Sequence, residues 1–238
     1  MIINLIAGPR NISTALMYSF AQRADTKVVD EPLYAYYLTQ TNVEHPGGEE
    51  VIQSMPVDYR EVLENIEALN KQHQYVFVKN MAHHLIMDDL SFLNSWTNVF
   101  LIRDPRELII SFNKVIKNPT IRDIGLKKSF ELFSSLENHV TVMDSNEVLK
   151  SPEVILEKLC QALGIPMDRN MLSWNAGARE EDGVWAKYWY ENVHKSTGFG
   201  KPRKRTDELP THLQPLYDEA IIYYNKLHPK SIKYAAEV

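Results

Sequence analysis

The chain has 238 residues, of which 44% are hydrophobic, and its formal net charge is -5 at pH 7. The negative net charge argues against non-specific nucleic-acid binding, and no apolar stretch approaches the ~20 residues that cross a bilayer. The single cysteine, Cys160, has no partner for an intramolecular disulfide, and residues 1–7 lack the length and the basic flank of a signal peptide.

These properties predict a cytoplasmic protein with a single domain over residues 1–238, because a chain of this length can bury one sizeable core. We expect neither nucleic acid nor a membrane as a partner, and the sequence does not define an oligomeric state. Positive charge is nevertheless clustered near the C-terminal end, at Lys195, Lys201, Arg203, Lys204 and Arg205.

The first half of the chain alternates apolar runs with segments of helical periodicity. In chain order it predicts a strand at Ile2–Ala7, a helix at Ser13–Arg23, a strand at Thr26–Asp30, a helix at about 58–72 and a strand at Tyr75–Val78. Residues 44–55 contain Pro46-Gly47-Gly48 and three glutamates, which predicts a surface excursion.

The second half continues the alternation. It predicts a strand at Asn98–Ile102, a helix at Pro105–Lys117 capped by Asp104, a strand at Val140–Met143, a helix at 152–163 ended by Gly164, and a last helix at about 210–227. Strands that alternate with helices predict a three-layer α/β fold with a central, mostly parallel sheet.

A candidate anion-binding loop follows the first strand. Its residues are Gly8, Pro9, Arg10, Asn11, Ile12, Ser13 and Thr14. Gly8 permits close approach of the backbone, Arg10 supplies a cation, and Ser13 and Thr14 supply hydroxyl groups on the first turn of the helix. The loop lacks the Gly-Lys pair of the kinase-type motif.

A second candidate anion site follows the strand that ends at Ile102. Arg103 stands at the strand end, and Ser111 lies eight residues later, about two turns into the next helix at 3.6 residues per turn. A guanidinium group can contact a phosphate through two N–H groups, which favours Arg over Lys at this point.

The two sites together resemble the nucleotide-binding signatures of sulfotransferases. The segments Val142-Met143-Asp144, Ser151-Pro152-Glu153 and Leu163-Gly164-Ile165-Pro166 resemble a further stretch of that family. The resemblance implies a P-loop NTPase-like sulfotransferase fold and the donor 3'-phosphoadenylyl sulfate (PAPS), with no metal. It further implies that Gly8–Thr14 hold the 5'-phosphosulfate, that Arg103 and Ser111 hold the 3'-phosphate, and that Lys201, Arg203, Lys204 and Arg205 belong to a basic loop that closes over the nucleotide.

Transfer of a sulfuryl group to a hydroxyl or amine requires a base that removes the acceptor's proton. Glu31 ends the second strand, where tyrosylprotein-type sulfotransferases carry a glutamate, and it is the favoured base. His83 and His84 compete with it, since cytosolic sulfotransferases use a histidine shortly after a strand-end lysine such as Lys79. Lys79 is expected to reach the bridging oxygen of the donor.

The sequence therefore predicts a PAPS-dependent sulfotransferase that acts on a small-molecule acceptor, which it does not identify. A P-loop nucleotide-dependent kinase is the alternative enzyme. A third reading is a nucleotide-binding protein that has lost its catalytic activity.

Overall fold

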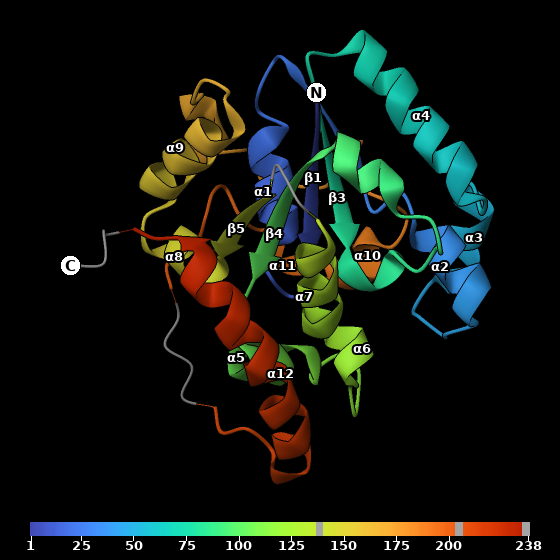
Figure 1. The fold of residues 1–238 in the computed structure, drawn as a ribbon, viewed down its shortest axis with the longest axis vertical. Coiled ribbons are helices and arrows are strands. Elements are labelled where there is room, and N and C mark those ends of the chain that lie inside the picture. Colours follow the sequence, from blue (N-terminus) through green and yellow to red (C-terminus); the bar gives the residue numbers. More distant parts are fainter. Residues whose placement is uncertain (137–139, 203–206, 235–238) are drawn as a thin grey trace.

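A six-stranded, all-parallel sheet forms the centre of the computed structural model, which describes residues 1–136, 140–202 and 207–234 (Figure 1). The strands are β1 (Ile2–Ala7), β2 (Thr26–Asp30), β3 (Tyr75–Met81), β4 (Thr97–Ile102), β5 (Val140–Asp144) and β6 (Ser231–Ile232). Their order across the sheet is β2-β3-β1-β4-β5-β6. The predicted parallel α/β class is confirmed.

Helices cover both faces of the sheet because alternate strand residues are apolar on each side. Ile3, Leu5 and Ala7 of β1 pack toward one face, and Ile2 and Ile6 toward the other. The first face carries α1 (Ser13–Phe20), α8 (Ser145–Lys150) and α9 (Pro152–Leu163). The second carries α4 (Tyr59–Gln72), α5 (Pro105–Phe112), α6 (Ile121–Ile124), α7 (Leu126–Ser135) and α12 (Gln214–Leu227).

A smaller apolar cluster lies beyond the carboxyl end of β3, built by α2 (Tyr34–Thr41), α3 (Gly48–Ser54) and α10 (Ala186–Trp189) (Figure 1). Residues 44–55, where the sequence predicts a surface excursion, contain α3. This helix lies at the surface, but its Val51 is fully buried in the cluster. A single apolar anchor among glutamates gave the sequence too little periodicity to reveal the helix.

Several predicted boundaries move by a few residues. The helix after Asp104 ends at Phe112 rather than Lys117, although the Asp104 carboxylate caps it as expected by accepting from Arg106 N at 2.8 Å. Gly164 ends α9 in the left-handed conformation, with φ of 68°, as predicted. The last helix begins at Gln214, after a short 3-10 turn at Thr211–Leu213.

The topology of the sheet brings the two predicted anion sites together. Strand β1 lies between β3 and β4, and the chain leaves β1 toward one side of the sheet and β4 toward the other. Ligands of open parallel sheets bind at such a reversal, outside the carboxyl ends of the strands. The segments after β1 and β4 therefore face the same crevice.

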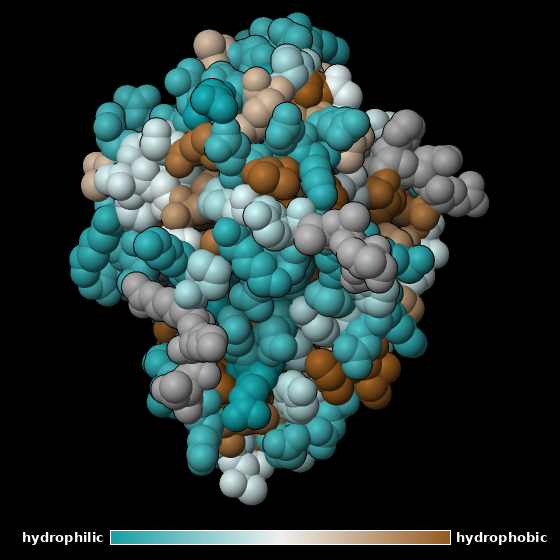
Figure 2. Space-filling view, turned by 90° about the vertical axis from the view of Figure 1, so that its left-hand side faces the viewer, coloured by the Kyte–Doolittle hydropathy of each residue, from teal (hydrophilic) through white to brown (hydrophobic). Residues whose placement is uncertain are grey.

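The surface over α8 and α9 is mostly hydrophilic, with apolar side chains in small separate groups (Figure 2). In the described parts of the chain, no helix combines the length and the apolar character that crossing a bilayer requires.

Candidate functional site

A cavity of about 630 Å³ opens at the carboxyl ends of β1, β3 and β4. It brings together nearly all of the predicted site residues, since its lining includes Pro9, Arg10, Asn11, Ile12, Ser13, Thr14, Glu31, Lys79, His83, His84, Arg103, Ser111 and Lys201. Gly8 is outside this lining. Arg203, Lys204 and Arg205 lie outside the described residues.

The loop after β1 is held in a constrained conformation. Arg10 and Ile12 adopt left-handed φ values of 61° and 60°, which cost free energy in residues other than glycine. The Asn11 side chain donates to the carbonyl of Leu101 at 2.9 Å, and the buried Ser145 hydroxyl donates to the carbonyl of Asn11 at 2.9 Å. Neighbouring strand ends thus fix the loop, and α1 begins directly after it.

Gly8 lies where the loop packs against α6. A Cβ atom at this position would lie 2.3 Å from the carbonyl oxygen of Ile124, at the end of α6. The glycine therefore allows α6 to pack against the loop. Its expected role beside a phosphate stays a prediction.

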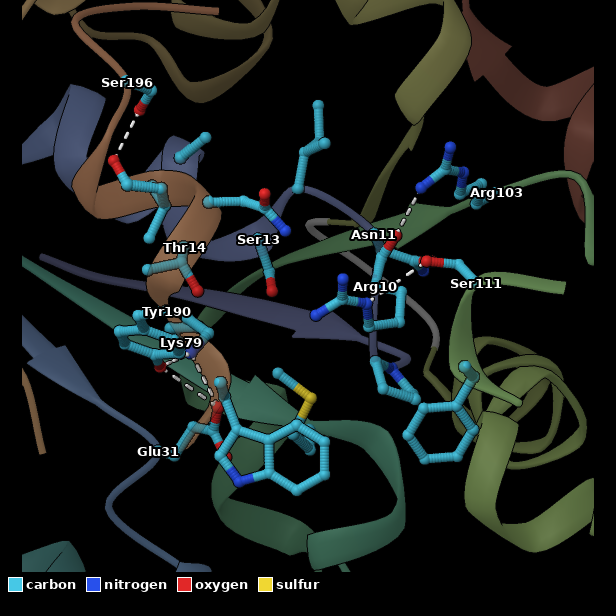
Figure 3. Close-up of a pocket in the computed structure, with 18 of the residues that line it drawn as sticks. Arg10, Asn11, Ser13, Thr14, Glu31, Lys79, Arg103, Ser111, Tyr190 and Ser196 are labelled. Atoms are coloured by element: carbon cyan, nitrogen blue, oxygen red, sulfur yellow. Dashed lines mark hydrogen bonds and ion pairs between the residues drawn. The ribbon is translucent and has the colours of Figure 1, made fainter. Parts of the chain in front are cut away.

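Arg10, Arg103 and Ser111 gather on one side of the cavity (Figure 3). The Arg103 guanidinium donates to the carbonyl of Arg10 at 2.6 Å and to Glu107 at 2.9 Å, and Arg10 Nε donates to the Ser111 hydroxyl at 3.3 Å. Two guanidinium groups and a hydroxyl within one hydrogen-bonded group form a site suited to a phosphate.

A buried charge network lies on the other side, around Lys79 (Figure 3). The Lys79 ammonium donates to Asp30 Oδ1 at 2.6 Å, to Glu31 Oε1 at 2.7 Å and to the Tyr190 hydroxyl at 2.5 Å. Tyr190 in turn donates to Asp30 Oδ2 at 2.7 Å and accepts from the Trp185 indole at 3.1 Å. All three N–H groups of Lys79 are used, so contact with a bound donor requires the loss of one of these bonds.

Glu31 combines an unusual backbone with a free carboxylate oxygen. Its φ is 41°, and its amide donates to the carbonyl of Lys79 at 2.8 Å. Lys79 holds Oε1, whereas Oε2 has no hydrogen-bond partner among the residues that the structure describes. Glu31 therefore offers one oxygen to the cavity while the other fixes the side chain.

Burial shifts the protonation of this network. It raises the pKa of Asp30 to about 6; Lys79 opposes the shift, and the like charge of Glu31 adds to it. Burial also disfavours the Lys79 ammonium, but the two carboxylates outweigh that effect and raise its pKa. Two carboxylates that share one ammonium leave one negative charge in excess at neutral pH.

His83 and His84 are buried beside this network. Burial lowers the pKa of His83 to about 3 and that of His84 well below its usual value, so both imidazoles are neutral at pH 7. His84 stacks against Tyr34 and Tyr37, with ring centroids 4.8 and 4.7 Å apart. The Nδ1 atoms of both histidines have no hydrogen-bond partner within the described parts of the chain.

The sequence did not identify Asp30, Tyr190 or Ser145 as site residues. Tyr190 is 160 positions from Asp30 along the chain and lies in a region of weak periodicity, so no local pattern joined them. The adjacent carboxylates Asp30 and Glu31, at a strand end, were the one available signal.

The chain belongs to the sulfotransferase family, since the family model described as "Sulfotransferase domain" matches residues 1–231. Two proteins of Arabidopsis thaliana, branched-chain-amino-acid aminotransferase-like proteins 1 and 2, are 38% and 37% identical to it over 230 residues. Each match covers 95% of this chain but 41% of the relative. The chain thus spans about two fifths of the length of these curated relatives.

Solved structures show the same fold. The sulfotransferase domain of the Synechococcus PCC 7002 olefin synthase aligns with a TM-score of 0.60 and 16% identity, over 94% of both chains. A sulfotransferase domain from the curacin biosynthetic pathway aligns with a TM-score of 0.57 and 18% identity, over 95% of this chain and 97% of that one. The P-loop-like sulfotransferase fold is therefore confirmed.

Proposed function

We propose that this chain transfers a sulfuryl group from PAPS to a hydroxyl or amine acceptor. The observation that carries the proposal is that one cavity joins two positively charged loops on one side to a carboxylate, Glu31, on the other. No local feature of the chain requires these segments to meet, and together they provide what the reaction uses: an anion site for the donor and a base for the acceptor.

The donor is assigned to the side of Arg10 and Arg103. Arg10, the backbone of residues 9–14 and the hydroxyls of Ser13 and Thr14 surround the amino end of α1, where a 5'-phosphosulfate is stabilised by N–H groups and by the helix dipole. Arg103 and Ser111 are assigned to the 3'-phosphate. Lys201 lines the same cavity, so the proposed basic loop over the nucleotide begins at its rim.

Glu31 is assigned as the general base. The acceptor oxygen or nitrogen attacks sulfur, its proton passes to Glu31 Oε2, and the bond from sulfur to the bridging oxygen breaks. The electron pair of that bond stays on the departing adenosine 3',5'-bisphosphate, whose charge Arg10 and the loop amides stabilise. Lys79 holds Oε1 and so directs Oε2 toward the acceptor.

The alternative bases, His83 and His84, have less support. A base with a pKa of about 3, as burial gives His83, has little affinity for the acceptor's proton. Both histidines are also held in aromatic contacts that fix their rings within the wall of the cavity.

Nucleotide titration of Arg103→Ala tests the donor assignment. Adenosine 3',5'-bisphosphate is expected to bind the unaltered chain much more tightly than 5'-AMP, which lacks the 3'-phosphate. Arg103→Ala is expected to weaken the bisphosphate by about ten- to a hundredfold, since a charge-assisted contact contributes roughly 1.5–3 kcal/mol. Binding of 5'-AMP is expected to stay nearly unchanged.

Arg106→Ala is the matched control, because Arg106 lies three residues after Arg103, in the first turn of α5, but outside the cavity lining. It is expected to leave both affinities unchanged. Equal affinity of the unaltered chain for the two nucleotides contradicts the proposal. Tight binding of ATP with a requirement for magnesium supports the kinase alternative instead.

A further inference from the structure

The side of the cavity that holds Glu31 has a wall of aromatic and imidazole rings. We name this the aromatic wall, and its members are Tyr34, His45, His83, His84, Trp185 and Trp189. Tyr34 is central, with its ring centroid 4.8 Å from that of His84 and 5.3 Å from that of Trp185. Its hydroxyl oxygen lies 2.8 Å from His45 Nδ1, and the ring centroids of His45 and Trp189 are 6.4 Å apart. The rings therefore form one continuous surface.

The aromatic wall carries no fixed positive charge in the part of the chain that the structure describes. Burial lowers the pKa of all three of its histidines, so they are neutral at pH 7. Arg122 and Asp123 act on His45 and His83 with opposite signs, and their effects oppose one another. The neighbouring ammonium group of Lys79 forms ion pairs with two carboxylates and donates a hydrogen bond to a tyrosine hydroxyl.

The two sides of the cavity therefore differ sharply in charge. In Figure 3, Arg10 and Arg103 lie on one side of the cavity, and Glu31 and Lys79 lie on the other. An anionic group is stabilised on the first side only. On the second side it meets one excess negative charge and neutral rings, and burying a charge without a partner is costly.

From this asymmetry we infer that the acceptor is a hydroxyl compound with a flat, apolar body that carries no negative charge, so that acidic acceptors are rejected. The inference rests on the proposed function, and it names the acceptor class for the same site. Flat apolar groups bury their area well against aromatic faces. An ammonium group meets no such penalty, because the two carboxylates that pair with Lys79 leave one negative charge in excess.

Three compounds with the same phenol ring test this inference. Tyrosol carries an uncharged side chain, 4-hydroxyphenylacetate a carboxylate, and tyramine an ammonium group. Their binding is measured by calorimetry on the full chain saturated with adenosine 3',5'-bisphosphate, and transfer of labelled sulfate to each is measured with PAPS. We expect tyrosol to bind and to be sulfated, 4-hydroxyphenylacetate to bind about tenfold or more weakly than tyrosol, and tyramine to bind more tightly than 4-hydroxyphenylacetate.

The outcomes separate the two proposals. If the bisphosphate binds tightly but tyrosol does not, or if 4-hydroxyphenylacetate binds as tightly as tyrosol or tyramine, the acceptor inference is overturned and the nucleotide site stands. If the bisphosphate binds no more tightly than 5'-AMP, the proposed function itself fails.

Two variants locate the selectivity. Trp189→Leu removes part of the aromatic wall and is expected to weaken tyrosol about tenfold with bisphosphate affinity unchanged. Tyr188→Leu, its neighbour on α10, alters an aromatic residue that is 42% exposed and outside the cavity lining, and is expected to change neither affinity. Equal effects of the two substitutions contradict the assignment.

His45→Arg tests the role of charge directly. His45 is only partly buried, so a fixed positive charge can be placed there. The ratio of the affinities for 4-hydroxyphenylacetate and tyrosol is expected to rise about tenfold, since a charged pair within the site replaces an unpaired carboxylate. An unchanged ratio in a variant that still binds the bisphosphate overturns the inference.

Discussion

At the scale of single residues, the proposed chemistry depends on Glu31 Oε2. Glu31→Gln keeps the shape of the side chain and its contact with Lys79 but removes the proton acceptor. We expect bisphosphate binding to be unchanged and kcat to fall by ~10²–10⁴-fold, the usual loss for a general base. Single-turnover transfer of labelled sulfate measures the effect. Full activity of Glu31→Gln together with an inactive His83→Asn or His84→Asn moves the base to a histidine.

Asp30 is predicted to set the pH range in which Glu31 works. The two carboxylates repel each other beside Lys79, so the network takes up a proton near the raised pKa of Asp30, about 6, and kcat falls below that pH. Asp30→Asn removes the repulsion. The acid limb of the kcat–pH profile is therefore expected to move to lower pH, by roughly one unit or more.

Tyr190→Phe serves as the opposite control. It removes a hydrogen bond that stabilises the ionised form of Asp30. The acid limb is therefore expected to move to higher pH. If neither substitution moves the acid limb of the kcat–pH profile, Asp30 does not control the protonation of Glu31. A change in the maximal kcat alone does not alter that conclusion.

At the scale of elements, the junction of β1, α1 and α6 depends on Gly8. Gly8→Ala places a methyl group 2.3 Å from the Ile124 carbonyl, a backbone atom, so α6 or the loop must shift. We expect a loss of about 1–3 kcal/mol of unfolding free energy, typical of overpacking, together with weaker bisphosphate binding. Denaturant unfolding and calorimetry measure the two effects.

Gly200→Ala is the control for this substitution, since a Cβ atom there meets nothing within 4 Å. It is expected to leave the unfolding free energy nearly unchanged. A Gly8→Ala variant as stable as the unaltered chain contradicts the tight packing of α6 on the loop.

At the scale of the whole molecule, the buried neutral histidines predict sensitivity to acid. Their pKa values are lower in the folded chain than the ~6.5 of an unfolded chain. The unfolded state therefore binds more protons below pH 6.5, and stability is lost as the pH falls from there toward 3. The slope is up to about 1.4 kcal/mol per pH unit for each histidine.

Asp30 acts in the opposite direction. Its pKa is raised on folding, so its contribution is present at low pH and is lost as the pH rises from about 3.8 to about 6. The stabilisation that Asp30 contributes on acidification is smaller than the stabilisation that the two histidines lose. A net loss of unfolding free energy is therefore expected between pH 7 and pH 5. Denaturant unfolding at both pH values measures it. His84→Phe keeps the stacked ring and should reduce the loss, whereas an unchanged free energy in the unaltered chain contradicts the prediction.

Residues 1–238 span about two fifths of the length of the Arabidopsis relatives. The activity proposed here is therefore assigned to this chain and not to the whole of those proteins. That these residues form a single domain stays a prediction. Two-state unfolding, with coincident transitions for fluorescence and circular dichroism, is its expected sign.

Local sequence patterns predicted the first five strands and located the two segments that are proposed to bind the donor. An apolar run followed by Gly8-Pro9, or by Arg103-Asp104-Pro105, is a local pattern, because chain neighbours decide where a buried strand ends and a helix begins. Glu31 and Lys79 were found for the same reason, since each stands at or near the end of such a run.

The surroundings of these residues depend on how distant segments pack together. The strand order places β1 between β3 and β4. The hydrogen-bonded network of Asp30, Lys79 and Tyr190 joins segments that are up to 160 positions apart in the sequence. The neutral state of His83 and His84 follows from burial, which no spacing in the sequence reports. Protonation and acceptor selectivity depend on desolvation and on distances between side chains, and both exist only once distant segments have packed together.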